Sequence, residues 1–337
     1  DHLVDSSLYG HDSHGQIRIY EYIGQIRDGL FDPEGTPRIE SDRPCAAVVD
    51  GGGALGQIGG AFATQLAIDK AREHGVATVA LRNTSHVGRV GAYPLQIARA
   101  GLVGLVFCNA GHLGRQIAPY GGLDGKLSTN PIAFAAPRRA ADPILVDMTT
   151  SVCAEGKIRV ASNRSVALPA GCIIDAEGNP STDPQAYLGD PPGAILPLGG
   201  PVAYKGYCLS FVVEILGGAL SGQGCAAGET VMQSNGLCIT AYNVDHFVER
   251  ASYFDEIESL IAHVRSSRID PALGEIMLPG DPEYRSAEER GREGIPIDDT
   301  AWERIQRAGS DLGLERSEEH TSELQSPCNL VCRLLLE

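Results

Sequence analysis

The sequence predicts an α/β fold, and two observations support this prediction. Between residues 46 and 108, short apolar segments alternate with longer segments in which apolar residues recur at helical spacing, in the order β, α, β, α, β. The chain also has the composition of a globular protein, because 43% of its 337 residues are hydrophobic and 21% are charged. Its length suggests about two domains.

The elements of the N-terminal half follow from hydrophobic spacing and from glycine. A helix is predicted over residues 16–30, where four apolar residues recur at helical spacing before Gly29. The strands and helices of the alternating series are predicted in turn at residues 46–50, 58–74, 76–81, 90–100 and 102–108. Such an alternation is typical of helices that pack on a sheet.

In the C-terminal half, the predicted elements are separated by stretches of Gly, Pro and polar residues. Strands are predicted over residues 131–136 and 144–147, and residues 156–160 continue this pattern. Residues 175–180 are predicted to form a turn-rich loop. The remaining expected elements are an apolar helix over residues 205–221, a strand over 237–242, a surface helix or loop over 282–294 and a last helix that contains Trp302.

Charge and cysteine content limit the classes of function. The formal net charge is −16, which argues against a nucleic-acid backbone or an anionic membrane as a partner. No apolar run reaches about 18 residues and the polar N-terminus lacks a signal-peptide pattern, so we expect a cytoplasmic protein. The nine cysteines show neither CxxC nor Cys/His ligand spacing. We interpret them as reduced core residues and expect no metal.

Both ends of the sequence differ from the rest. Residues 1–9 resemble the end of a helix, so we expect that a preceding segment is missing. Residues 316–326 resemble the translation of a common sequencing-library adapter. We therefore leave residues 316–337 out of the fold prediction as an artefact.

The segment GHDSHG at residues 10–15, together with Arg18, is the leading candidate for chemistry. Imidazole has the unperturbed pKa best suited to proton transfer near neutral pH, and a guanidinium binds a carboxylate through two parallel hydrogen bonds. On a helix, Arg18 would lie on the same face as His14. A 2-hydroxy or 2-oxo acid needs both groups. The alternative is an ordinary helix start, with Asp12 or Ser13 as the N-cap and incidental histidines.

A glycine-rich turn at residues 51–56 matches the GxGxxG pattern of Rossmann dinucleotide-binding folds, between a predicted strand and a predicted helix. The acidic residue expected about 20 positions later is absent, because the next strand ends near Arg82. Asp50, directly before the turn, would repel a pyrophosphate. We therefore interpret the glycines as a tight turn that packs a strand against a helix. Because Arg82 would suit a 2′-phosphate, the Rossmann fold remains an alternative.

Further motifs follow in a fixed order along the chain. They are NTSHVGRVG at residues 83–91, APYGG at 118–122, STNP at 128–131, DMTTS at 147–151, GK at 156–157, YKGY at 204–207, LPGDP at 278–282 and EGIPI at 293–297. Together with GHDSHG, this series resembles the malate/L-lactate/ureidoglycolate dehydrogenase family over about residues 3–314. Any one motif alone would carry little weight.

The resemblance implies a non-Rossmann, malate/L-lactate dehydrogenase-like α/β fold, with cofactor and substrate between two lobes. It implies interconversion of a 2-hydroxy acid and its 2-oxo acid with NAD or NADP, NAD being slightly favoured, in a homodimer. The expected divisions are 1–45 as the remnant of an N-terminal helical substrate segment, 46–110 as the α/β lobe, 111–281 as the cofactor-binding lobe and 282–315 as helices that return to the first lobe.

The resemblance also implies catalytic and substrate-binding roles. Ser13 and His14 match the family's proton-transfer pair, and His86 matches a histidine that is the acid/base in some members, so the two imidazoles compete for one role. Arg18 matches the arginine that binds the substrate carboxylate, and Thr129 matches a substrate contact. In such a reaction a protonated imidazole stabilises the developing oxyanion and delivers its proton, while Arg18 directs C2 of the acid towards the nicotinamide.

Cofactor contacts are implied for several short segments. The matching positions are His14, Gly88, Arg89, Val90, Leu145, Val146, Asp147, Met148, Thr149, Lys205, Asn235, Gly280, Asp281, Pro282 and Glu283. Arg89 and Arg115 would suit the 2′-phosphate of NADP, whereas Asp281 and Glu283 would oppose it.

Two alternatives remain open beside the hydroxy-acid dehydrogenase. One is an imine reductase of the same family; some of these carry an aspartate where this chain has Lys157, which we assign to substrate binding. The other is a truncated homologue that binds a nucleotide without turnover. Retention of the motif residues argues against long decay, but it does not exclude that a truncated chain is inactive.

Overall fold

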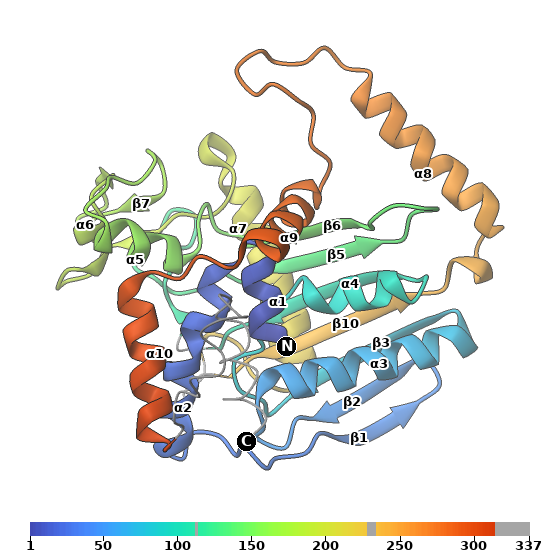
Figure 1. Ribbon diagram of the computed structural model, residues 1–337, viewed down its shortest axis with the longest axis horizontal. Helices are drawn as coiled ribbons and strands as arrows, with labels where there is room; N and C mark the ends of the chain where they lie inside the picture. The colour runs from blue at the N-terminus through green and yellow to red at the C-terminus, as the bar shows by residue number, and fades with distance from the viewer. Residues whose placement is uncertain (112–113, 228–233, 314–337) are drawn as a thin grey trace.

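The computed structural model describes residues 1–111, 114–227 and 234–313. At its centre lies a seven-stranded sheet in the strand order β1-β2-β3-β10-β4-β5-β6 (Figure 1). Its strands are β1 (Arg38–Arg43), β2 (Ala46–Asp50), β3 (Val76–Arg82), β4 (Val103–Asn109), β5 (Ile132–Ala136), β6 (Ile144–Met148) and β10 (Gly236–Tyr242). The α/β class predicted from the sequence is confirmed. The sheet takes strands from both expected lobes, residues 46–110 and 111–281.

The sheet is mixed. β2 and β3 pair in parallel through the connecting helix α3 (Gly56–His74), and the other neighbouring strands of this sheet pair antiparallel. β10 is the last of these strands along the chain, but it lies between β3 and β4. Six of its seven residues are buried, because helices cover both faces of the sheet here.

Helices cover the sheet from both sides. α3 and α4 (Ala92–Arg99) lie on one face, and α7 (Tyr204–Val213) with the π-helix Glu214–Leu220 lies on the other (Figure 1). Small side chains let α3 approach β3 closely; they are Ala63, Ala67 and Ala71, all fully buried. The predicted helix over residues 205–221 is confirmed, with π geometry in its second half.

A smaller body of structure is built from residues between β6 and α7. Its elements are α5 (Glu155–Asn163), β7 (Ile173–Ile174), β8 (Pro180–Ser181), α6 (Pro184–Leu188) and β9 (Ala194–Ile195). The strands form a sheet in the order β8-β7-β9. It shares an apolar cluster with α5 that contains Ile158, Ile173 and Ile195.

The prediction that residues 156–160 continue the pattern of short strands is wrong. These residues belong to α5, and its buried side chains are Ile158 and Ala161, three residues apart. That spacing places both side chains on one face of a helix, towards the apolar cluster. The apolar run at residues 156–160 is too short to distinguish the helical period of 3.6 residues from the strand period of two.

The first and last helices of the described chain lie side by side. α1 (His2–Leu8) packs against α9 (Asp281–Glu293), and α2 (Ile19–Arg27) packs against α10 (Asp299–Asp311) (Figure 1). The helix predicted over residues 16–30 begins as a 3₁₀ turn at Gln16–Arg18 before α2. The C-terminal helices of the described chain therefore pack against its N-terminal helices.

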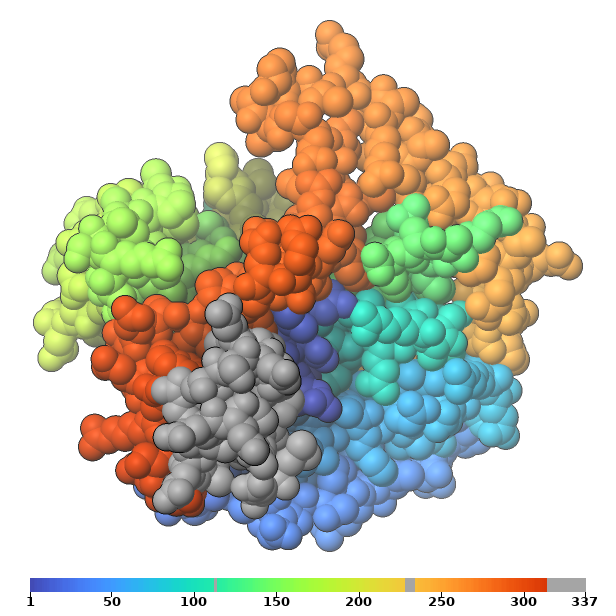
Figure 2. All heavy atoms as spheres, viewed as in Figure 1, coloured from blue at the N-terminus to red at the C-terminus, as the bar shows by residue number. Residues whose placement is uncertain are grey.

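The short elements β7, α6 and β9 are not predicted by the sequence, and neither are two longer ones, β1 and α8. All six residues of the edge strand β1 are exposed, and α8 (Arg250–Arg265) buries only Ile261. Neither carries enough buried apolar residues to show a periodicity. Figure 2 shows α8 and the segment after it, in orange, at the margin of the molecule.

The cysteines are free throughout the described residues. Cys108, Cys172 and Cys238 are buried, as a core interpretation requires. Cys45 and Cys208 are exposed, so the interpretation as core residues is wrong for these two. The two cysteines of the C-terminal tail, like all of residues 316–337, lie outside the described residues.

Candidate active site

Two imidazoles from distant segments stack on one another. His14 ends a 3₁₀ turn (Asp12–His14), and His86 lies in the loop after β3. Their ring centroids are 5.4 Å apart, with 19° between the ring planes. The Ser13 hydroxyl lies 3.0 Å from His14 Nδ1. The fold therefore brings together the three residues for which the sequence implied proton transfer.

Tyr22 and Gln57 complete this group from α2 and α3. The Tyr22 hydroxyl lies 2.7 Å from His86 Nδ1, and Gln57 Nε2 donates to the Tyr22 oxygen at 2.9 Å. Because the Gln57 amide occupies that oxygen as an acceptor, the Tyr22 proton is available to His86 Nδ1. This arrangement favours the His86 tautomer that carries its proton on Nε2.

The two imidazoles and the Tyr22 phenol are held in their neutral forms. Burial lowers the pKa of His14 from 6.5 to about 3, with the Arg18 guanidinium as the next cause. Burial likewise lowers the pKa of His86 well below its usual value, assisted by His14 and Arg18. Burial raises the pKa of Tyr22 to about 12. At neutral pH both imidazoles are therefore uncharged and the phenol keeps its proton.

Arg18 lies beside the histidines with part of its guanidinium unused. Nε donates to the Ser13 carbonyl at 2.7 Å, and Nη1 pairs with Glu21 at 2.6 Å. The Nη2 amino group has no partner among the described residues. It is the part of the side chain that can still bind a carboxylate.

Helix α9 holds the GHDSHG segment from outside. Arg290 donates to both carboxylate oxygens of Asp12 and to the Ser7 carbonyl. His11 lies 3.7 Å from Glu283 on the same helix. This contact connects one expected cofactor segment, residues 280–283, to the turn that carries His14.

A second group of expected cofactor residues surrounds Arg89. The Arg89 side chain is buried, lies 4.5 Å from the centre of the Tyr9 ring and is 3.8 Å from the Asp147 carboxylate. The same carboxylate accepts the backbone N–H of Gly91 at 3.0 Å. Gly88 has φ +74°, and a Cβ there would lie 2.5 Å from His2 Nε2. Residues 88–90 and Asp147 thus form one wall.

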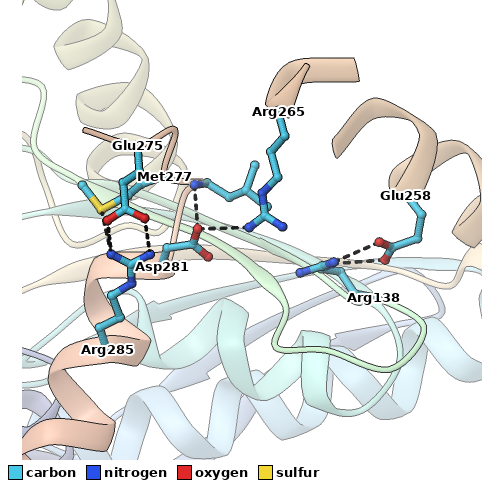
Figure 3. A network of polar contacts seen from close by, with 8 residues as sticks. Arg138, Glu258, Arg265, Glu275, Met277, Asp281 and Arg285 are labelled. Carbon is cyan, nitrogen blue, oxygen red and sulfur yellow. Dashed lines mark hydrogen bonds and ion pairs between the residues drawn. The ribbon is translucent and has the colours of Figure 1, made fainter. Parts of the chain in front are cut away.

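Residues 280–283 adjoin that wall at the start of β6. The Leu145 N–H donates to the Pro279 carbonyl at 3.0 Å, and Gly280 (φ +101°) packs against Leu145. The Asp281 carboxylate accepts the Leu278 N–H at 2.8 Å and lies 3.4 Å from Arg265. Figure 3 shows the contact between Asp281 and Arg265. The charge of Asp281 is therefore already engaged within the protein.

The remaining site residues lie on neighbouring segments. The Thr129 carbonyl accepts the Thr150 N–H at 3.0 Å, and the Thr150 carbonyl accepts the Leu198 N–H at 3.0 Å. The Leu198 carbonyl in turn accepts the Gly206 N–H at 3.1 Å, which places the segment of Lys205 beside that of Thr149. Figure 1 shows this region where α7 begins.

Several expected contacts are not formed by side chains in the structure. Lys157 and Lys205 are exposed, and neither forms a hydrogen bond or ion pair within the described chain. Lys157 is nevertheless close to the site, because its neighbour Gly156 adjoins Ser13. Met148 is 40% exposed and Pro282 is exposed.

The glycine-rich turn at residues 51–56 does not form a nucleotide cradle. The Asp50 carboxylate accepts the Gly52 N–H at 2.9 Å and Asn83 Nδ2 at 2.7 Å, and it pairs with Arg38. A Cβ at Gly52 would lie 2.6 Å from the Thr36 carbonyl oxygen. The turn therefore packs against the loop that contains Thr36.

Sequence reasoning missed Tyr22, Gln57 and the Arg290–Asp12 pair. Tyr22 and His86 are 64 residues apart, and no local spacing connects them.

Across the described ranges, no group of three or more His, Cys, Asp and Glu residues is arranged to hold a metal. A search of the same residues finds no helix with the length and hydropathy to cross a membrane.

Comparisons with known proteins identify the family of the chain. The sequence model of the malate/L-lactate dehydrogenase family matches residues 1–306. Hydroxycarboxylate dehydrogenase B of Escherichia coli O157:H7 is 36% identical over 318 residues, which cover 93% of this chain and 87% of that protein.

Two solved structures share the fold. Malate dehydrogenase of Pyrococcus horikoshii OT3 is similar with a TM-score of 0.84 and 32% identity, covering 94% of this chain and 88% of that one. Δ1-piperideine-2-carboxylate reductase of Pseudomonas syringae pvar. tomato is similar with a TM-score of 0.79 and 30% identity, covering 91% and 90%. The chain therefore belongs to the malate/L-lactate dehydrogenase family.

Proposed function

We propose that this protein is an NAD- or NADP-dependent oxidoreductase that interconverts a 2-hydroxy acid and its 2-oxo acid. The observation that carries the proposal is the stacked pair of neutral imidazoles, His14 and His86. They lie beside Arg18, whose Nη2 amino group has no partner among the described residues. One group transfers a proton and the other binds a carboxylate, which are the two needs of this reaction. The names of the relatives, which include malate and hydroxycarboxylate dehydrogenases, support the same substrate class.

The chain's own residues suit a dinucleotide cofactor. Arg89 is 3% exposed, and its Nε and Nη1 atoms have no hydrogen-bond partner in the described structure. The Asp147 carboxylate, 3.8 Å from Nη1, balances the charge of Arg89 without a hydrogen bond, so these N–H groups remain free to donate to a cofactor phosphate. Gly88 and Gly280 have left-handed backbones, and the lack of a side chain lets them approach His2 and Leu145 closely. When bound, a nicotinamide cofactor supplies or accepts the hydride at C2.

The protonation state of the imidazoles fits both directions of the reaction. In oxidation, a neutral imidazole accepts the hydroxyl proton of the 2-hydroxy acid. In reduction, the anionic 2-oxo acid adds negative charge beside His14 and His86, which raises their pKa and favours uptake of the proton that is later delivered to the oxyanion. Arg18 holds the carboxylate and so fixes which face of C2 is presented.

The experiment is to measure oxidation of NADH and of NADPH with pyruvate, oxaloacetate, 2-oxoglutarate and phenylpyruvate, in the wild type and in His14→Ala and His86→Ala. We expect turnover with at least one acid and a large loss in one or both variants, whereas His74→Ala, at an exposed position of α3, keeps wild-type rates. Full activity in both site variants contradicts the proposed acid/base role.

The second candidate is an imine reductase, and the similarity to the Pseudomonas syringae reductase favours it. A cyclic imino acid in the same assay distinguishes the two functions. Lys157, close to Ser13, favours the hydroxy acid, because some imine-reducing relatives carry an aspartate at this position. Cofactor binding without turnover of either substrate class would favour a non-catalytic homologue.

We further propose that the protein acts as a homodimer through α7 and the π-helix. Large apolar side chains are exposed along this face; they are Tyr204, Leu209, Phe211, Val212, Ile215 and Leu220. A helix that is apolar on all sides is expected to be covered on all sides. The sheet covers one side, and a second copy of the chain would cover the other.

A further inference from the structure

A buried carboxylate connects the two sides of the proposed site. Glu214 is the first residue of the π-helix and is 6% exposed. Its Oε2 accepts hydrogen bonds from Asn109 Nδ2 and from the Ala226 N–H, both at 2.8 Å. Its Oε1 accepts one from Asn130 Nδ2, also at 2.8 Å. One side chain thus joins three segments that are distant in the sequence.

One branch of these contacts reaches the histidine loop. The Asn109 carbonyl accepts a hydrogen bond from Asn235 Nδ2 at 3.0 Å, and Asn235 Oδ1 accepts the Val87 N–H at 2.9 Å. Both asparagines are buried. Val87 directly follows His86, so this series of hydrogen bonds fixes the backbone beside one of the two imidazoles.

The other branch reaches the loop of the proposed substrate contact. Asn130 directly follows Thr129, is fully buried and has a left-handed backbone, with φ 41°. Asparagine tolerates that conformation better than most residues, but a left-handed backbone still needs support from its surroundings. The contacts of its Nδ2 with Glu214 and with Ser210 Oγ, at 2.9 Å, give that support.

We propose that Glu214 is a positioning residue, which holds the His86 loop and the Thr129 loop so that both face the same bound acid. This inference rests on the proposed function, because it assigns the two loops to one substrate. Hydrogen bonds to a carboxylate in a buried site are strong, and removal of the acceptor leaves a buried N–H group without a partner. A change at Glu214 therefore disturbs both loops, although the residue lies behind them.

Glu214→Gln tests this role while keeping the side-chain shape. Because Oε2 serves two donors and Oε1 serves one, we expect the new amide nitrogen to face Asn130. Asn130 Oδ1 has no hydrogen-bond partner among the described residues, so either orientation of the Asn130 amide then leaves a buried N–H group unpaired. The value of kcat/KM for the 2-oxo acid should fall about 10- to 100-fold, as expected for one lost buried hydrogen bond. In Glu214→Gln/Asn130→Asp, the amide meets an acceptor again, and aspartate also tolerates a left-handed backbone. We expect the double variant to recover most of the loss.

Two control variants separate positioning from charge and from stability. Glu256→Gln removes an exposed negative charge from α8, and Ile68→Val weakens the buried side of α3. Amide hydrogen exchange over residues 84–91 and 128–131 reports both loops without requiring activity. We expect faster exchange in both segments of Glu214→Gln and wild-type exchange rates in the double variant. Ile68→Val should also exchange at wild-type rates in these segments, when each protein is measured at the same interval below its own melting temperature.

The outcomes are distinct. The role of Glu214 is overturned if exchange is unchanged in both segments of Glu214→Gln. It is also overturned if Ile68→Val loses as much kcat/KM as Glu214→Gln for the same loss of stability. If the wild type turns over none of the acids, the proposed function fails, and the exchange measurement still decides whether Glu214 fixes the two loops.

Discussion

At the residue scale, the two imidazoles are not equivalent. Gln57 donates to the Tyr22 oxygen, so Tyr22 donates its hydrogen bond to His86 Nδ1, and the neutral His86 carries its own proton on Nε2. The Ser13 hydroxyl beside His14 can donate or accept, so His14 can change its tautomer without losing its partner. A group that must both release and take up a proton benefits from that freedom, which favours His14 as the proton-transfer residue and His86 as the orienting one.

Tyr22→Phe should therefore lower kcat about tenfold, since it removes one buried hydrogen bond and leaves His86 Nδ1 and Gln57 Nε2 without a partner. The KM of the 2-oxo acid should change less. Steady-state kinetics of Tyr20→Phe provides the control, because Tyr20 lies on the same helix and its hydroxyl accepts a hydrogen bond from the exposed Arg304. Equal kcat values in the two variants would refute the orienting role.

The sequence could predict the residues of the site that lie within short motifs. Ser13, His14 and Arg18 occur within six positions, and their chemistry can be inferred from that spacing. Tyr22 and Gln57 could not be predicted, because their roles arise only when α2 and α3 pack against the His86 loop. The use of each His86 nitrogen is a property of tertiary packing and has no local signal.

At the scale of elements, α9 acts as a support for the segment that carries His14. Arg290 reaches from the last part of this helix to Asp12, and Ser286 donates to the Leu8 carbonyl at 2.9 Å. The turn at residues 10–15 contains two glycines and has no regular helix of its own to fix it. Its conformation therefore depends on contacts from a helix about 280 residues further along the chain.

Arg290→Met should loosen this turn. It removes a two-point contact with Asp12 and one with the Ser7 carbonyl, so we expect a loss of about 1–2 kcal/mol in the free energy of unfolding and a parallel fall in kcat/KM. Urea denaturation and steady-state kinetics measure the two effects. Arg292→Met, on the same helix with an exposed side chain, should behave as the wild type; a similar loss there would show that the effect is not specific to Asp12.

The exposed apolar face of α7 leads to a prediction about assembly. Ile215→Arg places a charge where the proposed partner copy would pack, at a side chain that is 55% exposed in the single chain. We expect a dimer in the wild type and a monomer in the variant by analytical ultracentrifugation, because burial of an unpaired charge is costly. Leu260→Arg on α8, at 58% exposure, should remain dimeric. A monomeric wild type would contradict the proposed dimer.

Longer elements with a buried face could be predicted from the sequence, whereas the two-residue buried strands β7 and β9 and the exposed edge elements could not. β3 and β10 show long apolar runs because both of their faces are covered. β1 and α8 lie at the edges of the fold, and their sequences lack a buried stripe. α5 shows the intermediate case, in which Ile158 and Ala161 alone could not distinguish a helix from a strand.

At the scale of the whole molecule, buried histidines couple stability to pH. His2 and His14 each have a pKa lowered from 6.5 to about 3, in both cases chiefly by burial. In the unfolded chain their pKa returns to about 6.5, so the unfolded state binds more protons below that pH. Their contribution to stability is therefore fully present above pH 6.5 and is lost as the pH falls towards 3.

We therefore expect the free energy of unfolding to fall between about pH 7.5 and pH 5.5, with a limiting slope of about 1.4 kcal/mol per pH unit for each such histidine. Urea denaturation across this range measures the slope. His14→Gln should reduce it, whereas His263→Gln, at an exposed position of α8, should not. A slope that is the same in all three proteins would show that buried His14 does not carry the effect.

The position of β10 also has a consequence for how the chain folds during synthesis. β3 and β4 never pair with each other; each needs β10, which begins at Gly236. A nascent chain that has left the ribosome as far as β6 therefore has two open strand edges in the middle of its future sheet. Pairing across so many residues closes large loops and is slow, so the emerging chain is exposed to aggregation for most of its translation. Fragments that end before Gly236 should accumulate in insoluble form, and chaperones that shield strand edges should matter most for this protein before its central strand is made.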